Sequence, residues 1–385
     1  MKLVGVELVR VAVPFRVDIG TAAGVHRTRS LLFVRVVADA AEGWGECAAL
    51  GEGTSVDPGL NEVELAAAGR GVARLIDASA ARGGELPAEA EVVQLFGSSP
   101  VDRMLAAVFE MAVSDAELRL GGRSMAEALG TVAGFGAMPV GAVVGIPADR
   151  NLDQVRESVG RAVGQGVARV RLKIEPGWDV EPVRVVRDEH PDLVLQVDAN
   201  GSFGLEDGDV AELERLAEFG VLCIEQPLPP ADLVAHAELA RRLTVPICLD
   251  ESLSSPRRVL DALRNESCRV ACLKPGRLGG VRATRTAHAA CTEAGVSVFV
   301  GGFFEAGLGR SSNLALAARM SEDAPGLVGD LGEPAAYLTV DPCGYPAVHN
   351  GWVRVPDQPG VGPPPDEITL GELGARRRWF PATYT

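Results

Sequence analysis

The sequence predicts an α/β protein: a modified TIM barrel of the (β/α)7β type that carries an N-terminal α+β capping domain. From about residue 138, short β-branched runs alternate with amphipathic helical stretches, which is typical of βα units on a parallel sheet. Five consecutive runs end in an ionisable residue, at intervals of 25, 27, 25 and 24 residues. The first 130 residues lack this alternation, since their strand-like segments precede their helical ones.

Residues 1–130 are expected to form the capping domain. LVGVELVRVAVPF and RSLLFVRVVA alternate apolar and polar residues as antiparallel strands do, and GWGECAAL is a weaker third strand. Two helical stretches follow, NEVELAAAGRGVARLIDAS and VDRMLAAVFEMAVSDAELRL. Strands followed by helices indicate an α+β unit.

Residues 131–340 are expected to form the barrel. Its strand-like runs lie at 138–146, 168–174, 193–198, 220–225, 245–250, 269–274, 296–302 and 326–330. Several of the helical patterns between them end at glycine, the usual helix C-cap. The number of units favours a closed barrel, and no G-x-G-x-x-G follows the first strand as it would in a dinucleotide fold. The Pro- and Gly-rich residues 341–385 are expected to pack back on the capping domain.

Composition excludes several classes of function. With 52 acidic and 37 basic residues the net charge is −15, which argues against nucleic-acid and anionic-membrane partners. No apolar run reaches the length of a membrane span, and the N-terminus lacks the continuous apolar core of a signal peptide. The seven scattered cysteines are expected to be reduced thiols in a cytoplasmic protein.

Lysine is rare in this chain. Only Lys2, Lys173 and Lys274 are lysines, whereas the other 34 basic residues are arginine. Arginine does not lose its proton in proteins, but a lysine can when its pKa is depressed. Lys173 and Lys274, each at the end of a predicted barrel strand, are therefore candidate acid/base groups.

Carboxylates end the three runs between these lysines. Asp198, Glu225 and Asp250 would meet at one mouth, because the carboxyl ends of barrel strands converge there. A single Asp at a strand end often caps the next helix, but three carboxylates that close repel unless a cation lies among them. Oxygen ligands without His or Cys suit Mg²⁺, with Mn²⁺ as a substitute.

The combination predicts removal of an α-proton from a small-molecule carboxylate. A metal would hold the substrate carboxylate and stabilise the enediolate, while a lysine takes or returns the proton. Arg171 shares a strand face with Lys173. Its charge is expected to lower the pKa of Lys173.

Several segments resemble the enolase superfamily, in its muconate-lactonizing subgroup. Those closest to the branch of o-succinylbenzoate synthases and N-succinylamino acid racemases are RLKIEPGWD, VDANGSF, IEQPL, CLDESL, LKPGRLGG and GGFFEAGLGRSSNLALA. The resemblance implies the following roles for residues of this chain. The Mg²⁺ ligands would be Asp198, Glu225 and Asp250, the acid/base pair Lys173 and Lys274, the polar groups around them Arg171, Asn200 and Glu251, and the pocket lining Gly301, Gly302 and Phe303.

Three features bear on the substrate rather than on the reaction class. Val143 stands where this branch often has serine, and the loop 51–64 lacks the aromatic residues common in the branch. The Gly-rich segment 19–29 is either a lid that offers Arg27 and Arg29 to a distal succinyl carboxylate or an ordinary solvated loop.

Four activities remain open at this stage. The same residues serve a lyase that forms o-succinylbenzoate and an isomerase that racemises N-succinylamino acids. The alternative is a muconate-type cycloisomerase or another acid-substrate member of the superfamily. The fourth possibility is a barrel that binds a metal and catalyses no reaction. Oligomers are common among such relatives, so a homo-oligomer is also left open.

Overall fold

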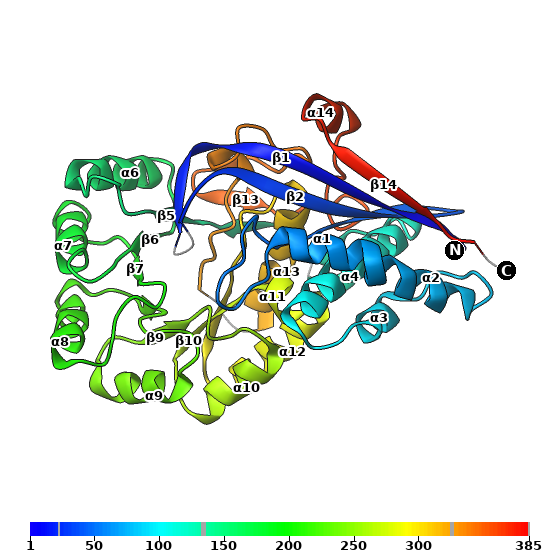
Figure 1. Ribbon diagram of the computed structural model, residues 1–385. Helices are drawn as coiled ribbons and strands as arrows, with labels where there is room; N and C mark the ends of the chain where they lie inside the picture. The colour runs from blue at the N-terminus through cyan, green and yellow to red at the C-terminus, as the bar shows by residue number, and fades with distance from the viewer. Residues whose placement is uncertain (22–23, 132–135, 324–326, 384–385) are drawn as a thin grey trace.

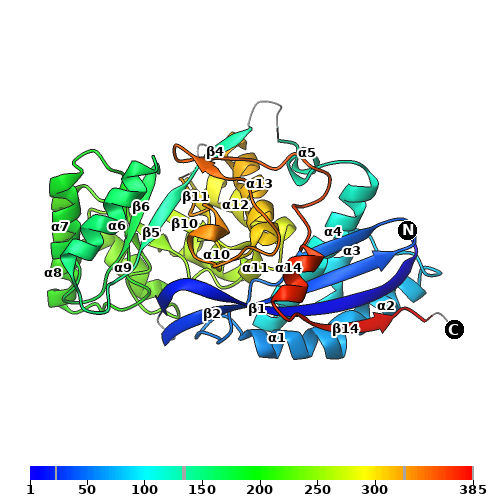
Figure 2. The ribbon, with the colours of Figure 1, turned by 90° about the horizontal axis from the view of Figure 1, so that it is seen from above.

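The computed structural model describes residues 1–385 apart from 22–23, 132–135, 324–326 and 384–385. It contains an antiparallel sheet packed on helices and a curled parallel sheet surrounded by helices (Figure 1). The two termini lie at the end of the molecule far from the parallel strands (Figures 1 and 2). The predicted fold class, a capped barrel, is confirmed.

The capping sheet has the strand order β14-β1-β2-β3. Its strands are β1 (Leu3–Thr21), β2 (Gly24–Ala38), β3 (Glu42–Glu46) and β14 (Arg376–Pro381). Its helices are α1 (Leu60–Ala66), α2 (Val72–Ala80), α3 (Glu89–Val92), α4 (Pro100–Leu120) and α5 (Met125–Leu129). Gly43 and Gly45 allow the backbone of α4 to lie directly against β3, where a Cβ would clash. The β1–β2 hairpin reaches from this sheet across to the barrel (Figures 1 and 2).

The barrel sheet contains seven parallel strands in the order β11-β10-β9-β8-β7-β6-β5. The strands are β5 (Gly141–Val144), β6 (Arg169–Lys173), β7 (Leu195–Asp198), β8 (Ile224–Glu225), β9 (Ile247–Leu249), β10 (Val270–Leu273) and β11 (Ser297–Val300). The helices that follow are α6 (Leu152–Gly164), α7 (Val180–Glu189), α8 (Asp207–Arg215), α9 (Leu233–Arg242), α10 (Pro256–Arg264), α11 (Pro275–Leu278), α12 (Val281–Glu293) and α13 (Gly307–Asp323). The alternation places every second strand residue inside the barrel.

Two predicted strands differ from the structure. The run 138–146 is divided, because β4 (Ala137–Pro139) pairs with the tail of the chain and only β5 joins the barrel. The eighth run, 326–330, begins outside the described residues, and 327–330 form no strand. Single hydrogen bonds from Leu327 N to Val298 O (3.1 Å) and from Gly141 N to Gly329 O (2.9 Å) nevertheless place this segment between β11 and β5.

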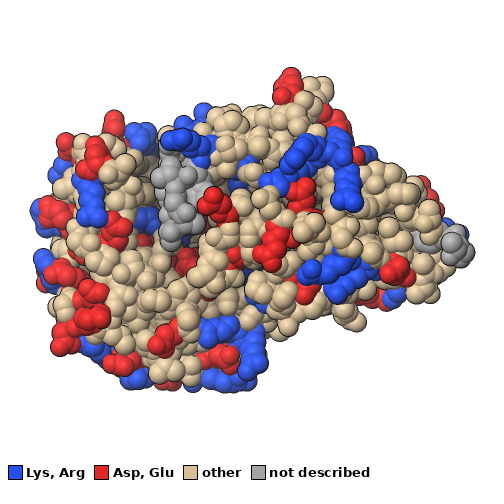
Figure 3. Space-filling model, in the orientation of Figure 1, with Lys and Arg blue, Asp and Glu red and all other residues tan. Residues whose placement is uncertain are grey.

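The C-terminal segment contacts both parts of the molecule. The strands β12 (Val348–His349) and β13 (Trp352–Arg354) form a hairpin, and β13 pairs with β4. The helix α14 (Glu367–Glu372) leads into β14. β14 pairs antiparallel with β1. Among the described residues, no helix combines the length and the apolar character needed to cross a bilayer. Acidic and basic side chains are interspersed over the face shown in Figure 3.

Candidate active site

The predicted acid/base and metal residues meet at the carboxyl end of the barrel. The parallel register pairs Lys173 with Asp198 and Asp198 with Glu225. Lys173 Nζ lies 2.6 Å from Asp198 Oδ2, and Lys274 Nζ lies 2.7 Å from Asp250 Oδ2. The three carboxylates are at most 2% exposed. Each lysine therefore contacts the carboxylate nearest to it, from opposite sides of the set.

The pKa values of the three carboxyl groups are shifted in different directions. Burial opposes ionisation of Asp198, but Lys173 and Arg171 hold the pKa of its carboxyl below the usual range. Burial likewise opposes ionisation of Asp250, where Lys274 and Arg277 keep the pKa low. Burial, against the opposing charge of Arg171, raises the pKa of Glu225 well above its usual value, and the two neighbouring aspartates add to this effect. Three acids this close thus favour an additional positive charge.

Lys274 departs from the expectation of a depressed lysine pKa. Burial favours the neutral amine of Lys274, but the Asp250 carboxylate outweighs it and raises the pKa of Lys274. Arg171 does not face Lys173 alone. Its guanidinium donates to Asp198 at 2.8 Å and to Glu225 at 2.5 Å, and it lies 2.6 Å from Asp330.

The predicted polar neighbours form a chain between the two sides of the site. Asn200 Oδ1 accepts from Lys173 at 2.6 Å, and Asn200 Nδ2 donates to Glu251 Oε1 at 2.9 Å. The backbone of Asn200 has φ 45°, in the left-handed region that Asn tolerates better than most residues. Glu251 Oε2 is buried and has no hydrogen-bond partner among the described residues. It is a free acceptor beside the carboxylate set.

The predicted pocket-lining residues lie beside Lys274. Gly301 follows β11, and a Cβ there would come within 2.5 Å of Cys272 Sγ and 3.1 Å of Lys274 Cε. A Cβ on Gly302 would clash with the carboxylate of Glu305. Phe303 is 5% exposed, and its ring centroid lies 4.8 Å from Lys274 Nζ. Gly301 leaves the space that the Lys274 side chain needs, and Gly302 leaves space for the Glu305 carboxylate.

Gly301→Ala is expected to lower kcat, because the added methyl group must displace Cys272 or the Lys274 side chain. Overpacking a tight site also costs about 1–3 kcal/mol of folding free energy. Steady-state kinetics and thermal denaturation measure both effects. Gly160→Ala is the matched control, since nothing lies within 4 Å of a Cβ at that position of α6. Equal kinetics for Gly301→Ala and the wild type would contradict this role.

Sequence reasoning missed the residue that joins the capping loop to the site. Arg277, which follows Lys274 by three positions, is 3% exposed and forks onto both carboxylate oxygens of Asp57 at 2.9 and 2.7 Å. The same guanidinium donates to Asp250 Oδ1 at 2.6 Å. The loop 51–64 is thus anchored on a carboxylate of the site. The segment LKPGRLGG contained this arginine, but its partner lies 220 positions away.

Asp57→Asn is expected to raise KM more than it lowers kcat, because it loosens the loop without removing a reacting group. Loss of a charged hydrogen bond to buried Arg277 should also lower the free energy of unfolding by about 1–3 kcal/mol. Asp153→Asn is the control, since the Asp153–Arg156 pair is solvent-exposed and such pairs contribute little. An unchanged KM would show that the anchor does not shape the mouth.

Asp330 is a second residue that the sequence did not single out. It lies at the end of the eighth barrel segment, 2.5 Å from Arg169 and 2.6 Å from Arg171. The run 326–330 was visible in the sequence as GLVGD, and its terminal acid was the available signal. Asp330 holds Arg171 from the side opposite Asp198 and Glu225.

Two substrate-side expectations are answered in part. Arg29 is not a lid cation, because it is 1% exposed and donates to the carbonyl oxygens of Phe304, Ser30, Ala49 and Ala48. Its partner in the prediction, Arg27, is exposed. The middle of the 19–29 segment includes residues 22–23, outside the described residues. Val143 is 43% exposed and pairs in register with Arg171, so it faces the barrel opening.

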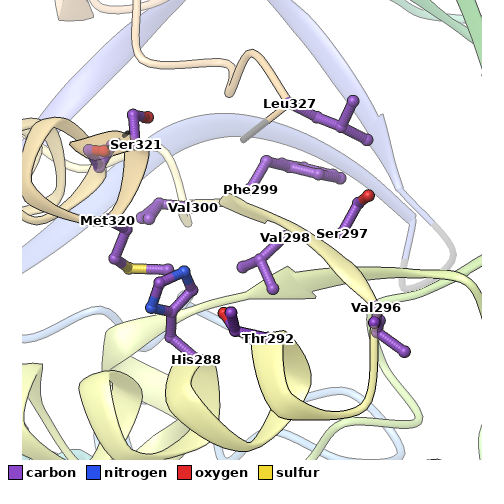
Figure 4. A pocket seen from close by; sticks show the side chains of 12 residues that line it. His288, Thr292, Val296, Ser297, Val298, Phe299, Val300, Met320, Ser321 and Leu327 are labelled. Atoms are coloured by element: carbon purple, nitrogen blue, oxygen red, sulfur yellow. Dashed lines mark hydrogen bonds between the residues drawn. The ribbon is translucent and has the colours of Figure 1, made fainter. Parts of the chain in front are cut away.

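A separate cavity of about 170 Å³ lies away from these residues (Figure 4). It is bounded by α12, β11 and α13, and His288, Phe299 and Met320 contribute to its lining. It contains none of the predicted site residues.

Comparisons with known proteins agree with this arrangement. Residues 154–369 match the family described as enolase C-terminal domain-like. An N-succinylamino acid racemase of Amycolatopsis is 40% identical over 99% of this chain and 100% of its own length. An o-succinylbenzoate synthase of Geobacillus kaustophilus is 35% identical over 89% of this chain and 88% of its own length. A solved enolase superfamily member from Listeria innocua has a TM-score of 0.88, 27% identity and full coverage of both chains.

Proposed function

The chain belongs to the enolase superfamily, in the branch of o-succinylbenzoate synthases and N-succinylamino acid racemases. We propose that it abstracts an α-proton from a succinyl-bearing carboxylate in a Mg²⁺-dependent reaction. It is an enzyme with lyase or isomerase activity. The observation that carries the proposal is the placement of two lysines on opposite sides of three buried carboxylates.

The donor set fits a hard divalent cation. Asp198, Glu225 and Asp250 supply carboxylate oxygens, and the unpartnered Glu251 Oε2 adds an acceptor beside them. Burial and the two neighbouring aspartates raise the pKa of Glu225, and a bound dication would oppose both effects. When bound, Mg²⁺ or Mn²⁺ would supply Lewis-acid stabilisation of the negative charge that develops on the substrate carboxylate.

The two lysines carry the proton transfer. Lys173 Nζ is held by Asp198 and Asn200, and Lys274 Nζ by Asp250, so the two amines are aimed from different strands. In the dehydration, Lys173 would remove the proton and Lys274 would stabilise the enolate by its charge. In racemisation, each amine would exchange the proton on its own face of the substrate. Arg171 and Asp330 hold the carboxylates in position and take no part in the proton transfer.

Synthase and racemase activity are separate outcomes of one test. Dehydration of the o-succinylbenzoate precursor is followed by loss of its absorbance, with Mg²⁺ and with a chelator. Chelator-sensitive turnover supports the synthase, and turnover of N-succinylamino acids by the same sample supports the racemase. A metal-loaded, folded protein inactive on both would contradict the proposal. The muconate-type cycloisomerase is the weaker alternative, because the curated relatives bear synthase and racemase names.

A further inference from the structure

A thiol lies at the floor of the carboxylate site. Cys272 is on β10, two residues before Lys274, so it points into the barrel one layer below that lysine. It is 1% exposed. One atom each from Glu225, Asp250 and Cys272 lie within 4.8 Å of one another. Asp198 is not a member of this trio.

The Cys272 thiol has no competing partner. Within the described residues no hydrogen bond to its Sγ is found, whereas the thiol of neighbouring Cys248 contacts the carbonyl of Leu249 at 3.8 Å. On one flank the thiol meets Gly301, where a side chain would come within 2.5 Å of Sγ. The glycine keeps this flank clear of side-chain atoms.

We propose that Glu225, Asp250 and Cys272 form a binding site for thiophilic divalent cations, of the class of Zn²⁺, Cd²⁺ and Co²⁺. Two carboxylate oxygens and one sulfur provide three ligands, a donor set that zinc-class ions accept and Mg²⁺ does not favour. The ion would compete with the donors that now hold these carboxylates, Arg171 and Gln196 on Glu225 and Lys274 and Arg277 on Asp250. Binding forms a metal–Sγ bond, and the thiol proton leaves to solvent.

The consequence is competition with the Mg²⁺-dependent reaction. Glu225 and Asp250 belong to both donor sets, so an ion drawn down toward Cys272 excludes Mg²⁺ from the mouth. Zn²⁺ and Cd²⁺ are therefore expected to inhibit, and excess Mg²⁺ should relieve the inhibition. The binding site itself goes beyond the proposed activity and does not depend on which substrate the enzyme takes.

Cobalt titration of the full-length protein, freed of metal, tests the site without an activity assay. Co²⁺ bound through a thiolate gives a sulfur-to-metal charge-transfer band in the near ultraviolet. The wild type should show this band, and Cys272→Ser should lose it and bind Cd²⁺ at least about tenfold more weakly, at unchanged Mg²⁺ affinity. Cys248→Ser, a buried thiol on the adjacent strand, is the matched control and should retain the band.

Absence of the band in wild-type protein that binds Mg²⁺ would overturn the site, as would its persistence in Cys272→Ser. If Cys272→Ser does not fold, Cys272→Ala replaces it, because alanine is apolar and smaller. Loss of the band in Cys248→Ser but not in Cys272→Ser would show that Cys248 is the sulfur ligand, and it would also overturn the proposal. An enzyme inactive on succinyl substrates that shows the band would refute the proposed function and leave the thiol site intact.

Discussion

Lys173→Arg is expected to lower kcat for the o-succinylbenzoate precursor by about 100- to 10,000-fold, the usual contribution of a general acid or base, and Lys274→Arg is expected to lower the rate of N-succinylamino acid racemisation by a similar factor. Arginine keeps the positive charge that pairs with Asp198 or Asp250, but it does not deprotonate in proteins. The substitution therefore removes the proton transfer and leaves the ion pair. Steady-state rates measured beside far-ultraviolet circular dichroism separate chemistry from folding.

The chain provides its own control for this series. Lys2, the remaining lysine, lies in the capping domain, where its backbone forms an isolated β-bridge with that of Glu85, so Lys2→Arg should retain wild-type turnover. In a synthase, Lys173→Arg should be the more severe change, because Lys274 acts there by charge alone. Wild-type turnover in both variants would contradict proton transfer by these lysines.

Removal of a carboxylate of the set should abolish metal binding and activity together. Glu225→Gln keeps the size of the side chain and removes a negative charge from a fully buried position. We expect the Mg²⁺ affinity to fall by at least about 100-fold, more than the 10- to 100-fold usual for residues that only support a ligand. Isothermal titration with Mg²⁺ and electron paramagnetic resonance of bound Mn²⁺ measure the loss.

Asp179→Asn tests the helix-cap alternative in the same barrel. Asp179 is also buried, but its carboxylate accepts from Val180 N at the start of α7. Its replacement should cost stability by about 0.5–2 kcal/mol as a lost cap and leave Mg²⁺ affinity unchanged. If Glu225→Gln binds Mg²⁺ as tightly as Asp179→Asn does, Glu225 is not a ligand.

The regular spacing of strand ends made the reacting groups predictable. Lys173, Asp198 and Glu225 each close a parallel strand, and parallel strands bring their carboxyl ends to one edge whatever the intervening helices contain. The eighth segment was harder to place, because it is joined to its neighbours by single hydrogen bonds and not by a ladder. A run of apolar residues predicts that a segment is buried, but it does not predict which backbone groups of the segment form hydrogen bonds.

The contacts around those groups were not predictable, for a physical reason. Asp57 and Arg277 are 220 positions apart, and no periodicity links a capping loop to a barrel helix. Arg29 shows the converse error, since a Gly-rich segment with arginines suggests a mobile cation, whereas the guanidinium is buried against backbone carbonyls. A charged residue in a loop indicates that it contacts a group of opposite polarity. The sequence does not show whether that group belongs to a substrate or to the protein itself.

Exchange of the substrate α-proton with solvent tests the central claim most directly. An N-succinylamino acid is incubated with Mg²⁺-loaded enzyme in D₂O, and deuterium at the α-carbon is followed by nuclear magnetic resonance. We expect exchange in the wild type that stops with a chelator. Lys173→Arg and Lys274→Arg should each stop exchange of the enantiomer whose α-proton faces the replaced amine. No exchange in folded, Mg²⁺-loaded protein that racemises the N-succinylamino acid, or exchange that survives the chelator, would contradict metal-assisted proton abstraction by these lysines.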